Sequence, residues 1–134
     1  MAGYSGTPLS KKLGIAPGYR VKTGRAPANY QELLTPLPAE VHLSSRFRSD
    51  VDLWHLFVKS RAELRAGLER AVREIKRDGT IWVSWPKKAS GVLTDMTEGA
   101  IRDAALPLGL VDVKVCAVDE TWSGLKLVIR KYLR

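Results

Sequence analysis

Two short apolar runs separated by one amphipathic helix pattern constrain the fold of this chain most strongly. Residues 53–58 (LWHLFV) and 80–85 (TIWVSW) are almost continuously apolar, which is typical of strands that are covered on both faces. Between them, residues 60–78 place apolar side chains at helical spacing, with Arg and Glu on the other face. Strand, helix and strand in this order predict two parallel strands joined by a crossover helix.

Helix-boundary signals divide the region that follows. We expect the first helix to begin after Ser60, with Glu63 at the capping-box position, and to end at Asp78-Gly79. A second helix is predicted after residue 95, with Asp95 as its N-cap and Glu98 at the third position. Gly109 marks its end.

The C-terminal residues predict a hairpin, and the first third of the chain predicts smaller elements. Strands over 110–118 and 125–129 are joined by only six residues, 119–124, which favours antiparallel pairing. Upstream, the residue pattern indicates short strands over 20–23 and 41–43, with a helix between them that Asn29 caps, with Glu32 as capping-box partner, and that prolines end. The predicted fold is α/β, a three-layer Rossmann-like, mostly parallel sheet with a C-terminal antiparallel hairpin.

The N-terminal residues are predicted to stand apart from this domain. We interpret residues 1–18 as a basic arm and residues 19–134 as one Rossmann-like domain. Within the arm, Thr7-Pro8 is a helix-start signal and Gly14 a stop signal.

Composition limits the compartment and the partners. No apolar run is long enough to span a bilayer, and Cys116 is the only cysteine, so we expect a cytoplasmic protein without a disulfide or membrane partner. The net charge is +8, and residues 1–31 contain five basic and no acidic residues. This balance favours anionic partners, although a basic surface that only maintains solubility explains it as well.

A ligand site is predicted where two loops meet. Ligands of open α/β sheets bind beyond the carboxyl ends of the parallel strands, and residues 85–91 and 119–123 would both follow such ends. Lysines there suit a phosphate or carboxylate, the acids suit a general base or a cation, and a tryptophan suits a ring. The alternative is an ion-paired loop cluster that only holds the hairpin. The candidate ligand-binding residues are Trp85, Lys87, Lys88, Ser90, Asp119, Glu120 and Trp122.

Motifs for catalysis and metal binding are not found. His55 lies within an apolar strand and is expected to be a hydrogen-bonded core residue, and His42 stands alone. Cys116 lies among valines and is expected to be an inert thiol. The sequence contains no Gly-x-Ser-x-Gly elbow and no phosphate-loop motif. We therefore expect no catalytic residue, no metal and no cofactor.

Parts of the chain resemble an uncharacterised bacterial family. Residues 79–130, with the blocks WPKK and DETWSGLKLV, and residues 3–18 (GYSGTPLSKKLGIAPG) are similar to the domain of unknown function 3052. This resemblance implies no particular activity.

A weaker resemblance is to class I methyltransferases, which use S-adenosylmethionine (SAM). Their sheets also end in a reversed hairpin, and residues 53–85 look like the strand-helix-strand unit that follows their cofactor site. After the first strand, however, these enzymes have a glycine-rich loop, whereas this chain has Thr23-Gly24-Arg25-Ala26-Pro27. Their ribose-binding acid would fall near Ser44-Ser45-Arg46, where no acid is present. The resemblance implies a truncated relative that no longer binds SAM.

Three functions follow as hypotheses. The first is a non-catalytic module that binds an anionic small molecule or an acidic partner at Lys87, Lys88 and the 119–123 loop. The second is an atypical SAM-dependent methyltransferase. The third is a nucleic-acid-binding protein that uses the basic segment 11–25.

Overall fold

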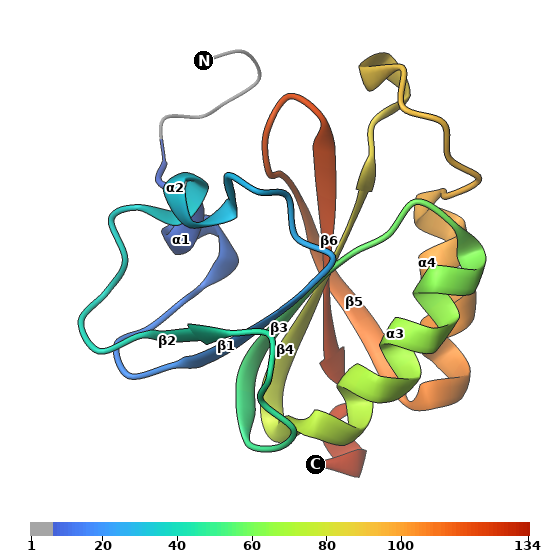
Figure 1. The fold of residues 1–134 in the computed structure, drawn as a ribbon. Helices are drawn as coiled ribbons and strands as arrows, with labels where there is room; N and C mark the ends of the chain where they lie inside the picture. The colour runs from blue at the N-terminus through green and yellow to red at the C-terminus, as the bar shows by residue number, and fades with distance from the viewer. Residues whose placement is uncertain (1–6) are drawn as a thin grey trace.

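A six-stranded mixed sheet forms the centre of the computed structural model, which describes residues 7–134. The strand order is β2-β1-β3-β4-β6-β5 (Figure 1). Strands β1 to β4 pair in parallel, whereas β6 is antiparallel to both β4 and β5, so that β5 runs in the same direction as β4. The fold-class prediction is confirmed. The strands are β1 (Arg20–Gly24), β2 (His42–Ser44), β3 (Val51–Phe57), β4 (Ile75–Pro86), β5 (Leu110–Ala117) and β6 (Trp122–Ile129).

Helices cover both faces of the sheet, which makes three layers (Figure 1). One face packs against α3 and α4 through a core cluster that includes Trp54, Ile81 and Val83. The other face packs against α1 and α2 through a cluster that includes Phe57 and Trp82. The helices are α1 (Leu9–Leu13), α2 (Tyr30–Leu34), α3 (Arg61–Glu74) and α4 (Glu98–Ala105), with 3₁₀ turns η1 (Lys88–Ser90), η2 (Leu106–Leu108) and η3 (Lys131–Leu133).

Helix α3 begins where the sequence predicts and ends earlier. Ser60 Oγ accepts a hydrogen bond from the Glu63 backbone N–H at 3.1 Å, as expected of an N-cap. The predicted end at Asp78-Gly79 is wrong, because Ile75 already pairs with Val51 in the sheet. The register then shifts, so that Thr80 pairs with Leu53 and residues 76–79 bulge from the strand.

The predicted N-cap of the second long helix is wrong. The N-cap of α4 is Thr97, whose Oγ1 accepts from the Ala100 N–H at 3.0 Å. Asp95 instead accepts from the Arg61 N–H at 2.9 Å and so places a carboxylate at the start of α3. The tertiary structure brings Asp95 close to the first N–H group of α3, which the local sequence does not reveal. Asn29 is the N-cap residue of α2, as predicted, but its side chain makes no capping hydrogen bond.

The predicted N-terminal arm lies partly outside the described residues, which begin at Thr7. Its remainder packs on the sheet, with Leu9, Leu13 and Ile15 buried in the second core cluster. Trp82 Nε1 donates to the Leu13 carbonyl at 2.9 Å. The N-cap of α1 is Pro8 rather than the predicted Thr7. Gly14, with φ of 81°, ends the helix as predicted.

Close packing of α3 on β3 depends on Gly67. An ideal Cβ at this position would lie 2.4 Å from Leu56 Cδ2 and 3.1 Å from Leu56 Cγ. We expect Gly67→Ala to lower the free energy of unfolding by about 1–3 kcal/mol, because overpacking outweighs the gain in helix propensity. Urea denaturation measures this change. As a control, Gly99→Ala in α4, where a Cβ would meet only Thr97 Oγ1, at 3.9 Å, should be neutral or stabilising by up to about 1 kcal/mol.

Candidate functional site

The two loops predicted to share an edge of the sheet lie next to each other. Trp85 pairs with Ser123 and Pro86 with Trp122 at the end of the β4–β6 ladder. The Lys87 N–H then donates to the Thr121 carbonyl at 2.8 Å. Both loops lie at the upper edge of the sheet in Figure 1. The geometry on which the predicted site depends is therefore present. We call residues 85–91 and 119–123 together the rim.

The two tryptophans of the predicted site do not face a common ligand. Trp85 belongs to the core cluster under α3 and α4, whereas Trp122 belongs to the cluster on the opposite face of the sheet. Each is only 9% exposed, and Trp122 meets Phe57 edge to face at 5.0 Å. These two predicted ligand-binding residues therefore share no surface. Trp122 pairs with Pro86, the neighbour of Trp85, and successive positions along a strand face opposite sides of the sheet.

Two polar residues of the rim form the turns of its loops. Ser90 Oγ donates to the Lys87 carbonyl at 2.6 Å and accepts from the Val92 N–H at 3.2 Å. Asp119 Oδ1 accepts from the N–H groups of Thr121 and Trp122, both at 2.8 Å. These bonds hold the loops in one conformation and occupy Ser90 Oγ and Asp119 Oδ1.

Three charged side chains of the rim make no such bond and can face a ligand. Lys88 and Glu120 are exposed and Lys87 is half-buried. Within residues 7–134, none of the three side chains forms an ion pair or a hydrogen bond. The rim therefore offers two cations and one carboxylate on a backbone held by hydrogen bonds.

A hydrogen-bonded chain of side chains lies buried beneath this edge. His55 Nδ1 is 2.6 Å from Tyr30 Oη, and His55 Nε2 is 2.7 Å from Ser84 Oγ. His55 and Ser84 are completely buried, and burial lowers the pKa of His55 to about 3. His55 is therefore a neutral core residue, as the sequence indicates, and this Ser–His pair has no access to a substrate.

The lone thiol has the properties of an unreactive cysteine. Cys116 lies half-buried on β5, and burial raises its pKa, although Lys12 and Lys114 act in the opposite direction. A thiol with a raised pKa is a poor nucleophile at neutral pH.

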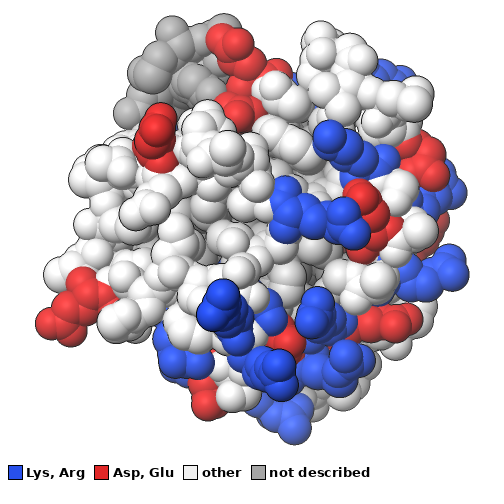
Figure 2. Space-filling view, viewed as in Figure 1, with Lys and Arg blue, Asp and Glu red and all other residues white. Residues whose placement is uncertain are grey.

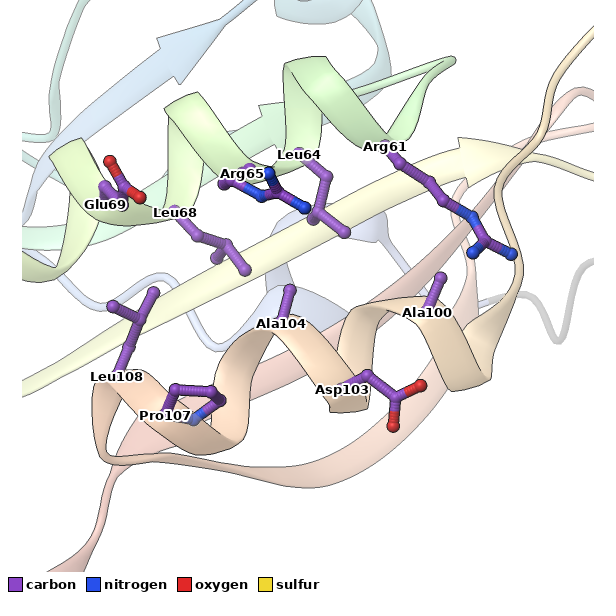
Figure 3. A pocket seen from close by; sticks show the side chains of 10 residues that line it. All are labelled: Arg61, Leu64, Arg65, Leu68, Glu69, Ala100, Asp103, Ala104, Pro107 and Leu108. Atoms are coloured by element: carbon purple, nitrogen blue, oxygen red, sulfur yellow. The ribbon is translucent and has the colours of Figure 1, made fainter.

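A hollow between α3 and α4 was not predicted from the sequence. Its volume is about 370 Å³, and Figure 3 shows Leu68 of α3 and Ala104 of α4 pointing into the space between the two helices. Small residues at positions 100 and 104 of α4 are the only sequence signal for it, because its shape depends on how the two helices pack. Charged side chains of both signs line this hollow. The lining residues are Arg61, Leu64, Arg65, Leu68, Glu69, Ala100, Asp103, Ala104, Pro107 and Leu108.

Comparison with protein families identifies the chain's relatives. Residues 47–131, from the segment before β3 to η3, match the family described as protein of unknown function, DUF3052. The chain belongs to this family. Strands β1 and β2 of this DUF3052 protein lie outside the matched residues. No curated protein matches the chain.

Solved structures with a similar fold include SAM-dependent methyltransferases. An O-methyltransferase from Thermotoga maritima has a TM-score of 0.62 at 10% identity over 92% of the DUF3052 chain and 64% of its own. TrmN from Thermus thermophilus has a TM-score of 0.61 at 12% identity, over 91% of the DUF3052 chain and 47% of its own. A SAM-dependent methyltransferase from Aquifex aeolicus has a TM-score of 0.64 at 13% identity, over 91% of the DUF3052 chain and 88% of its own. At this identity the likeness shows the fold alone, and the chain spans less than two thirds of the first two proteins.

The residues at the corresponding cofactor edge do not fit SAM. After β1, Arg25 takes a left-handed conformation with φ of 59° and pairs with Glu63 at 2.9 Å. A Cβ at Gly24 would lie 2.6 Å from the Trp54 ring, so this glycine makes room for a core side chain rather than for a ligand. At the end of β2, Ser44 Oγ accepts from the Arg46 N–H, and positions 44–46 contain no acid that could bind a ribose. We therefore derive no methyl-transfer step.

Among residues 7–134, no group of three or more His, Cys, Asp or Glu side chains is arranged to hold a metal ion. Over the same residues, no helix combines the length and the apolar character needed to cross a bilayer.

Proposed function

We propose that this DUF3052 protein is a non-catalytic binding module with a methyltransferase-like fold, and that it takes an anionic small molecule or an acidic partner at the rim. The observation that carries the proposal is the main-chain hydrogen bond from Lys87 to Thr121 at 2.8 Å. It places two cationic side chains on a fixed loop, at the edge where open α/β sheets bind ligands.

The chemistry of the rim favours a small anion over a neutral ligand. Lys87 and Lys88 supply ammonium groups that interact with a phosphate or carboxylate, while Glu120 disfavours a second negative charge nearby. The tryptophans are buried in the core, so recognition would rest on charge rather than on stacking.

Thermal-shift measurements with nucleotides and small organic acids test this proposal. A ligand present at about ten times its Kd stabilises the native state by about 1.4 kcal/mol. For a domain of this size we expect the parent protein's Tm to rise by about 5 °C. Lys87→Ala/Lys88→Ala should abolish most of this rise, because both cations that face the ligand are gone.

The matched control is Lys114→Ala/Lys131→Ala, which removes the same charge at exposed positions outside the rim. This variant should respond to the ligand as the parent does. The proposal fails if no compound stabilises the parent, or if both double variants lose the response equally.

An atypical SAM-dependent methyltransferase is the second candidate, and it rests on the fold similarity alone. Isothermal titration with millimolar SAM separates it from the first. We expect no saturable heat, because Arg25 and Glu63 occupy the edge where the cofactor would approach. Saturable binding that Arg25→Glu removes would favour the methyltransferase instead.

A further inference from the structure

The positive charge of the chain is concentrated at the edge of the sheet opposite to the rim. We call this surface the basic edge; it consists of residues 20–22, 46–52, 70–78 and 130–134. It contains eleven Lys and Arg but only four Asp and Glu. The whole chain contains 22 Lys and Arg and 14 Asp and Glu. The residues outside the basic edge therefore hold eleven basic and ten acidic side chains and are almost neutral. Figure 2 shows the blue side chains gathered at the lower end of the molecule, where Figure 1 places the end of α3 and the C-terminus.

Specific contacts join the segments of the basic edge into one surface. Lys22 Nζ lies 2.6 Å from Glu74 Oε1 and 2.5 Å from the Phe47 carbonyl, and so links β1, the end of α3 and the 46–52 segment. Arg20 lies over the Phe47 ring at 4.0 Å. Arg77 Nη1 donates to the Leu133 carbonyl at 2.8 Å and links the β4 bulge to η3.

Several cations of this surface remain available to a partner. Asp52 pairs with Lys76 at 2.9 Å, and Glu74 pairs with the buried Lys22. Four exposed cations of the basic edge form no ion pair and no side-chain hydrogen bond in the part of the chain that the structure describes. They are Arg46, Arg48, Arg73 and Lys131.

An exposed aromatic ring lies among these cations. Tyr132 is 80% exposed and sits on η3 between Lys131 and the last residue, Arg134. The turn that carries it is held by hydrogen bonds from Leu133 N to the Arg130 carbonyl and from Arg134 Nε to the Ile129 carbonyl, both 2.8 Å. A phenol ring that is carried on a hydrogen-bonded turn and left open to solvent provides a surface on which a base can stack.

The geometry points to single-stranded nucleic acid as the partner of the basic edge. Eight of its eleven cations are arginines, whose planar guanidinium matches phosphate oxygens with two parallel hydrogen bonds. Tyr132 stacks on a base, which requires that the base is not already stacked in a duplex. Phosphate contacts with one aromatic platform predict binding with little sequence preference. The site shares only residues 20–22 with the predicted basic segment 11–25; within that segment Lys22 is buried and Arg25 is paired with Glu63.

Fluorescence anisotropy with labelled single strands tests this inference on the full chain. The probes are mixed-sequence RNA and DNA of about 20 nucleotides, somewhat longer than the 4–16 nucleotides that one binding module covers. We expect affinity for both to fall steeply between about 50 and 200 mM salt. Arg46→Ala/Arg48→Ala/Arg73→Ala should weaken binding at least about tenfold and reduce the log–log salt slope by about 2.

Tyr132 is tested separately, because stacking and charge have different signatures. Tyr132→Ala should weaken binding at least about fivefold with an unchanged salt slope, whereas Tyr132→Phe should retain the parent affinity. A duplex of the same sequence should bind more weakly than the single strand, since its bases are not free to stack.

The charge-matched control is Lys87→Ala/Lys88→Ala/Lys114→Ala, which removes three cations outside the basic edge and should bind nearly as the parent does. The inference is overturned if neither strand binds at the lowest salt, or if the control loses as much affinity as the arginine variant. Binding to anionic lipid vesicles without binding to either strand would also overturn it. Since the control carries the rim substitutions, failure here and failure of the proposed rim site are distinguishable.

Discussion

Replacing Lys22 by methionine is expected to lower the free energy of unfolding by about 3–5 kcal/mol. Lys22 is 4% exposed and bonds Glu74, which also accepts from Trp54 Nε1 at 2.8 Å. Burial raises the pKa of Glu74, but the hydrogen bonds from Lys22 and Trp54 outweigh it and keep this pKa below its usual value. Without Lys22, a carboxylate is left in the core with only the more distant Arg70, at 3.7 Å, as counter-ion.

Urea denaturation at several pH values gives this prediction a specific signature. In the parent, the contribution of Glu74 is present above the pKa of its unfolded state and is lost as the pH falls through its lowered folded pKa. In Lys22→Met, the hydrogen bond and the charge of Lys22 that lower the pKa of Glu74 are lost, so the destabilisation should be largest at neutral pH, where the carboxylate is charged, and should shrink as the pH falls.

The double variant Lys22→Met/Glu74→Gln is the control for the charge. Both charges are removed, while the glutamine carbonyl still accepts from Trp54, so a large part of the stability should return. If the double variant is as unstable as Lys22→Met, the loss comes from packing and the interpretation as an unpaired buried charge is wrong.

Acidification from pH 7 to 4.5 is expected to remove about 2.5–3 kcal/mol of stability through His55 alone. The folded pKa of His55, about 3, lies far below the model-compound value of 6.5. Between these two values the unfolded chain binds a proton that the folded chain does not, so stability falls as the pH falls. The slope is about 1.4 kcal/mol per pH unit.

Substitution of the two histidines separates this effect from general acid denaturation. His55→Gln should unfold more readily at neutral pH, because the bonds to Tyr30 and Ser84 are disturbed, but its stability should change little between pH 6.5 and 4.5. His42→Gln, at an exposed position on β2, should retain the parent's slope. An equal slope in His55→Gln would contradict the prediction.

Local patterns in the sequence were sufficient for the central and C-terminal elements. The apolar runs at 53–58 and 80–85 predict strands covered on both faces, and both are buried inside the sheet. Ser60 marks the start of α3 as predicted. Gly109 ends the 3₁₀ turn η2, whereas α4, which it was predicted to end, already stops at Ala105. The apolar runs and Ser60 predict correctly because an apolar run and a helix-capping residue can be recognised within a few positions of the chain.

The candidate sites depend on contacts between residues far apart in the chain. The sequence placed 85–91 and 119–123 at one edge, because strand direction alone decides it. The roles of Trp85, Trp122, Ser90 and Asp119 needed the pairing register and the loop hydrogen bonds.

The sequence by itself therefore determined the α/β class, the order of its main elements and the excess of positive charge. Only the tertiary structure decided that α3 ends at Glu74, that Asp95 caps a helix other than its own, and that Lys22 is buried. It also gathered four separate segments into the basic edge beside Tyr132. The physical reason is that propensity and periodicity act over a few residues, whereas burial and charge clustering arise between residues that only folding brings together.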